Sequence, residues 1–338
     1  MAARLKIGKL VVIGVGLIGG SFALALKRAR AVRRVVGVGR TRANLADALR
    51  LKVIDEAAHD PARAVRDADL VLLATPVGQM PSVMSAIAPH LPAHAVLTDA
   101  GSTKRDVIAC ARRFLGARLP RFVPGHPVAG TELSGAAAAF PELFRGRNVI
   151  LTPQPGAAAG AVTLVRRAWE ACGARVLRLD AGVHDEVLAA VSHLPHVVAY
   201  ALVNMLAGRR NPAQLFGLSA GGLRDTVRIA GSSPEMWADI CVANRDALLA
   251  ALEDYENELE ETRAAIERAD AEELRRLFKR ARDAREKWLV RKPPHPFPLH
   301  PLTPSLSPKR REEGSSPPSP LGRRAGMRDR VARAKGRR

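Results

Sequence analysis

The sequence has few residues that could form disulfides, metal clusters or a membrane span. Its three cysteines, Cys110, Cys172 and Cys241, form no C-x-x-C pair, which excludes a disulfide framework and favours a reduced cytoplasm. The apolar stretch near the N-terminus is interrupted by glycines and is shorter than the roughly 20 residues that cross a bilayer. With 338 residues, 47% of them hydrophobic, the chain can bury more than one core. We therefore expect a cytoplasmic protein of two domains that binds neither metal nor membrane.

Acidic residues are scarce as well. Lys and Arg number 53 against 33 Asp and Glu, a net charge of +20, and residues 291–338 carry half of this excess, with thirteen basic against three acidic residues. The same segment holds ten of the 24 prolines and has no apolar period, so we predict a disordered basic tail. Such a tail could bind nucleic acid, but it offers only Phe297 for base stacking. We therefore favour a dispensable extension without a nucleic-acid partner.

A dinucleotide-binding fingerprint follows directly after the first apolar run, with its glycines at Gly14, Gly16 and Gly19. The first glycine permits a tight turn, the second lets the backbone approach a diphosphate, and the third lets the helix pack closely on the strand. The diphosphate would then rest on the N–H groups at the helix start, near Leu17 and Ile18. Basic residues before an apolar stretch also resemble a secretory signal, but the glycine register and a second strand at 34–38 indicate a Rossmann unit.

The end of this second strand selects the nicotinamide cofactor. An acidic residue there would hold the ribose 2′-hydroxyl of NAD, but Gly39 fills the place, and Arg40, Thr41 and Arg42 follow. A guanidinium and a hydroxyl can bind a 2′-phosphate through charge-assisted hydrogen bonds. We therefore expect NADP, with NAD as the alternative if the arginines only begin a solvated helix.

The pattern of strands and helices predicts an α/β domain over residues 8–180, with one doubly wound sheet. After the first two strands, the others are expected at residues 69–75, 94–99, 121–125, 148–152 and 175–179. Ligands bind beyond the carboxyl ends of such strands, so Thr75 and Pro76 should border the cofactor. Ser102 should point its hydroxyl toward the nicotinamide, unless it only caps the next helix.

Residues 181–290 show a pattern of helices only, which predicts an all-α domain for substrate binding and dimerisation. His193 and His196 are three residues apart and should share one helical face; they could also be core residues or ligands of zinc, although no third ligand stands in a suitable frame. An apolar seam recurs every three or four residues, at Leu248, Leu252, Tyr255, Leu259 and Ile266. Such a seam packs two long helices, either in a dimer or within one chain.

The stretch HPVAGTELSG at 126–135 gathers titratable and hydroxyl groups in a loop, which is typical of a site. It is one of several motifs that stand in a fixed order: the fingerprint, DAGSTK at 99–104, GHPVAGTELSG at 125–135, HDEVLAAVSHLPH at 184–196 and GGLRDTVRIAGSSPEMW at 221–237. In these motifs the chain resembles the prephenate and arogenate dehydrogenase family of tyrosine biosynthesis, roughly over residues 8–288. The resemblance implies oxidation of the ring carbinol of prephenate by NAD(P)⁺ with loss of carbon dioxide, giving 4-hydroxyphenylpyruvate. Arogenate would give tyrosine.

The resemblance also implies roles for single residues. His126 matches the catalytic histidine of the family, Ser102 the serine that orients the same hydroxyl, and Arg228 the substrate arginine. Further candidates for substrate binding in these motifs are His196, Asp225, Thr131 and His193. The chemistry agrees, because a neutral imidazole can accept the carbinol proton and a planar guanidinium binds carboxylate in two places. Aromatisation of the ring drives decarboxylation, so no metal is needed.

Two other functional classes would each explain part of the sequence. A β-hydroxyacid-type dehydrogenase would share the fingerprint and the helices but not the SHLPH and GGLRDTVRIAG segments. A nucleotide-sensing or nucleic-acid-binding protein could use the basic tail, but it needs neither a base nor a carboxylate clamp.

The resemblance further implies a homodimer formed through the helical domain.

Overall fold

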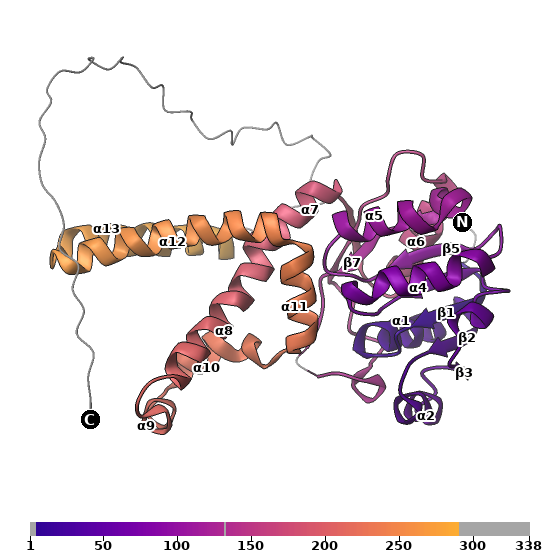
Figure 1. Cartoon of the computed structure of the whole chain (residues 1–338), viewed down its shortest axis with the longest axis horizontal. Helices are drawn as coiled ribbons and strands as arrows, with labels where there is room; N and C mark the ends of the chain where they lie inside the picture. The colour runs from indigo at the N-terminus through magenta and orange to yellow at the C-terminus, as the bar shows by residue number, and fades with distance from the viewer. Residues whose placement is uncertain (1–4, 132, 291–338) are drawn as a thin grey trace, which may run out of the picture. The chain divides into compact units, whose positions relative to one another are not determined.

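The N-terminal part of the protein is built on a six-stranded parallel sheet (Figure 1). The computed structural model describes residues 5–131 and 133–290. The strands are β1 (Ile7–Ile13), β2 (Val32–Val38), β3 (Glu56–Ala58), β4 (Leu70–Leu73), β5 (Val96–Asp99) and β6 (Phe122–Val123). Their order is β3-β2-β1-β4-β5-β6, so the winding direction reverses between β1 and β4, where sheets of this type bind ligands. The predicted doubly wound fold is confirmed.

Helices cover both faces of this sheet. They are α1 (Leu17–Arg28), α2 (Arg42–Arg50), α3 (Pro61–Ala64), α4 (Met80–Ile87), α5 (Arg105–Phe114) and α6 (Ala159–Ala171). Alternate residues of β1 enter different cores: Leu10 packs in the cluster that contains Trp169 of α6, while Val11 packs in the cluster that contains Met84 of α4. This alternation follows from the two-residue period of a strand. Burial on both faces also explains why the sequence shows these strands as continuous apolar runs.

The last two predicted strands do not complete the parallel sheet. They form a separate three-stranded sheet of order β7-β8-β9, made by β7 (Gly125–Pro127), β8 (Asn148–Leu151) and β9 (Arg175–Arg178). The predicted strand 121–125 is divided between the two sheets, because Pro124 has no N–H to continue the ladder. Side chains of β5 replace the ladder there: the hydroxyl of Thr98 donates to the carbonyl of Val123 at 2.7 Å.

After residue 180 the described chain is helical, as predicted. The helices are α7 (Ala181–Leu188), α8 (Leu194–Ala207), α9 (Pro212–Gly217), α10 (Gly221–Val227), α11 (Pro234–Ala243), α12 (Arg245–Glu267) and α13 (Ala271–Val290). A π-helical turn, Ala189–His193, joins α7 to α8. The carboxylate of Asp180 begins α7 by accepting the N–H of Gly182 at 2.7 Å, an N-cap that satisfies helix-start donors. All described residues fall in one compact unit, so the domain boundary at 180 stays a prediction.

The apolar seam of α12 is only partly covered within the chain. Helices α12 and α13 pack as a hairpin (Figure 1), in which Ala265 and Leu277 are buried. Leu248 is buried too, but Leu259 and Ile266 keep 50% and 60% of their surface exposed. A single chain therefore leaves part of the seam free to pack against another molecule. The predicted tail, residues 291–338, lies outside the described residues.

Candidate active site

The turn between β1 and α1 has the geometry of a diphosphate cradle. Gly14 adopts φ +100°, and a Cβ there would stand 2.4 Å from the carbonyl oxygen of Ala74. A Cβ at Gly19 would stand 2.3 Å from the carbonyl oxygen of Gly14, whereas Gly16 faces open space. Gly16 is also the N-cap of α1, and no side chain caps that helix start. The free N–H groups of Leu17 and Ile18 and the open approach at Gly16 fit a dinucleotide diphosphate.

Thr75 and Pro76 follow β4 and adjoin this turn. Thr75 carries a buried hydroxyl that has no hydrogen-bond partner within residues 5–131 and 133–290. Pro76 precedes the short 3₁₀ helix Val77–Gln79. Both residues stand at the carboxyl end of a central strand, where the prediction placed the border of the cofactor site. An unpaired buried hydroxyl is costly in a folded protein, and a bound dinucleotide would offer it partners.

Arg40 and Thr41 lie at the β2–α2 junction. Both side chains are exposed, and Thr41 is the N-cap of α2 without a side-chain capping bond. A Cβ at Gly39 would stand 3.2 Å from a methyl carbon of Leu45 and 3.4 Å from its γ-carbon. The junction thus presents a guanidinium and a free hydroxyl at the end of β2, the place where ribose specificity is set.

Ser102 does not cap α5, so the capping alternative for this residue is wrong. The residue before α5 is Lys104, and Ser102 lies half-buried two residues earlier. The cap comes instead from Asp185 of α7, whose carboxylate accepts the N–H groups of Lys104 and Arg105, both at 2.8 Å. A carboxylate is favourable at a helix N-terminus because the free N–H groups and the helix dipole are positive there. The hydroxyl of Ser102 is therefore not required by the helix.

Lys104 is fully buried and neutralised by β5. Its ammonium contacts the carboxylate of Asp99 and donates to the carbonyl of Gly125 at 2.8 Å. The same carboxylate accepts the N–H of Gly101 at 2.8 Å and of Gly125 at 3.1 Å. A buried charge pair is tolerated when such additional hydrogen bonds satisfy it. This network holds the backbone next to His126 and leaves Lys104 unsuited to bind a substrate carboxylate.

His126 lies in strand β7, not in the loop that the sequence suggested. It pairs with Ile150 of β8 and is only 8% exposed. Its Nδ1 lies 2.9 Å from Nε2 of His184 on α7. Burial, and next the neighbouring His184, hold the pKa of His126 well below its usual range. The imidazole is therefore neutral at pH 7 and able to accept a proton.

His184 connects His126 to Asp185. Its Nδ1 lies 2.8 Å from Oδ1 of Asp185, and both side chains are fully buried. Burial also lowers the pKa of His184. Burial alone would raise the pKa of Asp185, but the hydrogen bonds from His184 and from the start of α5 outweigh it and lower the pKa. Asp185 is thus an ionised carboxylate at the end of a three-residue chain.

His193 and His196 share one helical face, as predicted. The ring of His196 stacks on Trp237 of α11 at 3.6 Å, and the ring of His193 meets the same indole edge-on at 6.0 Å. His193 is buried and its Nδ1 lies 3.1 Å from the amide nitrogen of Asn244. Burial lowers its pKa to about 4. In the described part of the chain, no group of three His, Cys, Asp or Glu side chains could hold a metal ion.

Arg228 stands close to His196 in the helical part. It begins the 3₁₀ helix Arg228–Gly231 after α10. Burial is the main cause that lowers the pKa of His196, and the positive charge of Arg228 lowers it further. A hydrogen bond to the carbonyl of Ser192 acts in the opposite direction but does not outweigh them. The hydroxyl of Tyr200 donates to the carbonyl of Ser232 at 2.7 Å and ties this turn to α8. The structure thus brings two of the predicted substrate residues together.

Thr131 and Asp225 are both exposed. The hydroxyl of Thr131 accepts the N–H of Leu133 at 3.2 Å, and Asp225 lies on α10. Among the described residues, neither forms a hydrogen bond or an ion pair with His126, so their roles stay predictions. Sequence reasoning missed His184, Asp185, Asn244 and Trp237. His184 and Asp185 stand in the motif HDEVLAAVSHLPH, but no local pattern gives them a role, and nothing local marks Asn244.

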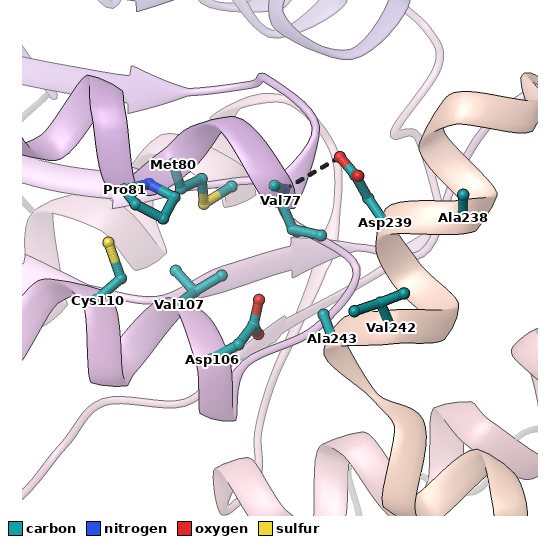
Figure 2. A pocket seen from close by; sticks show the side chains of 11 residues that line it. Val77, Met80, Pro81, Asp106, Val107, Cys110, Ala238, Asp239, Val242 and Ala243 are labelled. Carbon is teal, nitrogen blue, oxygen red and sulfur yellow. Dashed lines mark hydrogen bonds between the residues drawn. The ribbon is translucent and has the colours of Figure 1, made fainter.

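A cavity of about 300 Å³ lies between α4, α5 and α11 (Figure 2). Its wall is mainly apolar, with Val77, Met80 and Val107 on one side and Val242 on the other. The carboxylate of Asp239 accepts the N–H of Gly78 at 3.1 Å across one edge. This bond joins α11 directly to the segment that follows Thr75 and Pro76. The cavity adjoins the segment after Pro76, and none of the four histidines described above lines it.

A Rossmann-type turn and a buried neutral imidazole are the features expected of a nucleotide-dependent dehydrogenase. Comparison with known protein families agrees. Residues 22–178 match the nucleotide-binding domain of prephenate dehydrogenase, and residues 180–280 match its dimerization domain. The chain belongs to the prephenate dehydrogenase family.

Individual relatives cover most of the chain. A cyclohexadienyl dehydrogenase from Zymomonas mobilis subsp. mobilis is 39% identical over 82% of this chain and 94% of its own length. A prephenate dehydrogenase from Bacillus subtilis is 38% identical over 82% of this chain and 75% of its own. The crystal structure of prephenate dehydrogenase from A. aeolicus, in complex with hydroxyphenyl propionate and NAD⁺, aligns with TM-score 0.79 at 35% identity. It covers 85% of this chain and 100% of that one.

Proposed function

We propose that this enzyme is a prephenate dehydrogenase that oxidises the ring carbinol of prephenate and releases 4-hydroxyphenylpyruvate and carbon dioxide. The observation that carries the proposal is His126, a buried neutral imidazole in a strand beside the nucleotide domain. As hydride leaves the carbinol carbon its hydroxyl becomes acidic, and a neutral base of this kind accepts the proton. Family membership and the 38–39% identity to prephenate and cyclohexadienyl dehydrogenases support the same reaction.

The residues of this chain divide the work between base and anion binding. Ser102, which does not cap α5, orients the carbinol hydroxyl toward His126. Arg228 binds a substrate carboxylate through its planar guanidinium, with His196 beside it. Thr131, Asp225 and His193 complete the candidates for substrate binding. The nicotinamide accepts the hydride when bound, and aromatisation of the ring drives loss of carbon dioxide without a metal.

For the cofactor we infer NADP, with NAD as the alternative. Gly16, the N-terminus of α1 and the unpaired hydroxyl of Thr75 suit either dinucleotide. Arg40 and Thr41 favour a 2′-phosphate, because both are exposed at the end of β2, where no carboxylate stands to repel it. NAD⁺ is the cofactor in the A. aeolicus crystal structure, so direct comparison of the two cofactors is the relevant test.

We further infer a homodimer formed through the helical part. Residues 181–207 form a continuous helical stretch that contains an 18-residue window of mean hydropathy 1.4, and only 22% of that window is buried within the chain. Such a helix is long and apolar enough to cross a membrane, by length and composition alone. However, His184, Asp185 and His193 in its first half are buried among polar partners of this chain. A second copy covering the apolar face is the better explanation, and it agrees with the family's dimerization domain.

The experiment that tests the function is a steady-state comparison of prephenate and arogenate, each with NAD⁺ and NADP⁺. Turnover of prephenate to 4-hydroxyphenylpyruvate, with reduced nicotinamide formed in equal amount, is the expected result. Exclusive use of arogenate would redirect the proposal to the sister substrate. Absence of turnover with either would overturn it.

The buried thiol of Cys172 and two partly buried ones, none in a disulfide, suit the cytoplasm that we propose as the compartment.

A further inference from the structure

The chain His126–His184–Asp185 admits only one arrangement of protons when both imidazoles are neutral. A carboxylate only accepts hydrogen bonds, so Nδ1 of His184, 2.8 Å from Asp185, must carry a proton. Nε2 of His184 is then an acceptor, and Nδ1 of His126, at 2.9 Å, must carry the next proton. Nε2 of His126 is therefore left with a lone pair. The network thus selects the nitrogen that acts as the base.

The surroundings of Asp185 keep its carboxylate ionised. It accepts the N–H groups of Lys104 and Arg105 at the start of α5, and the guanidinium of Arg105 lies 3.6 Å away. The amide of Asn244 donates to its backbone carbonyl at 2.7 Å and holds the residue from the α12 side. The other charged groups near the histidines, Lys104 and Asp99, neutralise each other. Asp185 is thus the carboxylate that acts on His126 through His184.

We propose that His184 and Asp185 are positioning residues that fix the tautomer of His126 and stabilise its protonated form. The inference rests on the proposed function. As hydride leaves the carbinol carbon, the O–H bond of the substrate breaks and the proton joins Nε2 of His126. Nδ1 keeps its own proton, so that His126 becomes an imidazolium. No proton leaves His184, and Asp185 stays ionised. The imidazolium later returns its proton to solvent.

Two variants of His184 separate the hydrogen bond from simple packing. In His184→Gln the longer side chain can place a carbonyl oxygen where Nε2 stood and still accept from His126. In His184→Asn the shorter side chain reaches only the position of Nδ1, so the bond to His126 is lost. We expect His184→Gln to retain turnover within about tenfold and His184→Asn to lose roughly 10²–10⁴-fold, the range of general-base contributions. Michaelis constants for substrate and cofactor should stay within about twofold in both.

Asp185→Asn tests the charge. An anion near His126 favours the imidazolium, so its removal should shift the acid limb of kcat/KM to lower pH and lower the plateau. A merely structural role for Asp185 would leave the limb where it is. Because Asp185 also caps α5, thermal unfolding is recorded for every variant, and the His184 pair keeps the test valid if Asp185→Asn is unstable. The control is His94→Gln, which alters an exposed histidine 3.5 Å from Asp69 and should leave turnover unchanged.

A readout without turnover separates this inference from the proposed function. With ¹⁵N-labelled histidine, the imidazole of His126 should show a protonated Nδ1 and a bare Nε2 in the wild type and in His184→Gln. In His184→Asn it should show a mixture. A bare Nδ1 in the wild type, or equal turnover in the two His184 variants, would overturn the proposal that His184 positions His126. If prephenate is not turned over but Nδ1 is protonated, the reaction assignment fails and the tautomer assignment stands.

Discussion

At the residue scale, the proposed role of His126 as base requires an imidazole that stays uncharged until the substrate arrives. Burial holds the pKa of His126 below its usual range, so little of it is protonated at pH 7. We expect His126→Asn to lower turnover by roughly 10²–10⁴-fold, because the amide cannot accept the carbinol proton. Cofactor affinity, measured by fluorescence titration, should change little, since His126 lies in β7 and not in the nucleotide turn. Wild-type turnover in this variant would remove His126 from the mechanism.

Arg228 should act in binding more than in chemistry. The carboxylate that it binds is present in both the ground state and the transition state, so its loss removes uniform binding. Arg228→Ala should therefore raise the Michaelis constant for prephenate much more than it lowers turnover. Arg224→Ala, which alters an exposed arginine on the preceding helix α10, serves as the matched control. An unchanged Michaelis constant for Arg228→Ala would mean that another cation binds the substrate, and Lys104 is not available for it because Asp99 pairs with it.

Sequence reasoning predicted His126 as the base but missed the residues that contact it, His184 and Asp185. His126 and Ser102 were identifiable because they stand in short polar motifs, whereas the contact of His126 with His184 joins residues 58 positions apart. Such a contact depends on where α7 docks, which no local pattern reports. Asp185 looks like an ordinary acidic residue near a helix start. Only the fold shows that the carboxylate of Asp185 caps a different helix, α5, and that its neighbour His184 contacts His126.

At the scale of elements, the junction of β2 and α2 is where we expect the choice between NAD and NADP to be made. A charge-assisted hydrogen bond to a 2′-phosphate is worth about 1.5–3 kcal/mol, roughly one to two decades in affinity. We expect the wild type to prefer NADP⁺, and the double variant Gly39→Asp with Arg40→Ala to prefer NAD⁺. A Cβ at Gly39 would stand 3.2 Å from Leu45, so a shift of a few tenths of an ångström accommodates it. Ratios of kcat/KM for the two cofactors measure the preference.

The single variant Arg40→Ala separates loss of the guanidinium from gain of the carboxylate. Arg50→Ala, at the far end of α2 and paired on the surface with Asp47, should leave the ratio unchanged. A wild type that already favours NAD⁺ by a decade or more would show that Arg40 and Thr41 face solvent in the complex.

The elements themselves were predictable to different degrees. The strands β1, β2, β4 and β5 are apolar runs buried on both faces, and their existence followed from the sequence. Their pairing partners beyond β5 did not. Both β8 and β9 read as ordinary strands, and membership of one sheet or another depends on Pro124 and on the contact of Thr98 with Val123. Strand periodicity carries no information about such long-range pairing.

At the scale of the whole molecule, a second copy is expected to cover the exposed helical face. The chain mass is 36.3 kDa, so light scattering after size exclusion should give about twice that value. Met205→Glu, on the exposed face of α8, should raise the dissociation constant of the dimer roughly tenfold or more, because it buries an unpaired charge. Leu49→Glu, on α2 and similarly exposed at 41% against 45% for Met205, should leave it unchanged. A monomer in the wild type, or association only with detergent micelles, would contradict the dimer.

The short path from Val123 through Pro124 fixes the position of His126 and does not tolerate a change in its length. Two strand residues of one sheet precede Pro124 and three of the other sheet follow it. The direction of the His126 side chain therefore depends on the number of residues between Val123 and His126. Successive side chains of a strand point to opposite faces. An insertion or deletion of one residue between Val123 and His126 would therefore turn the imidazole away from His184, even if both sheets formed intact. Natural variation in this enzyme should accordingly change the identity of residues here more readily than their number.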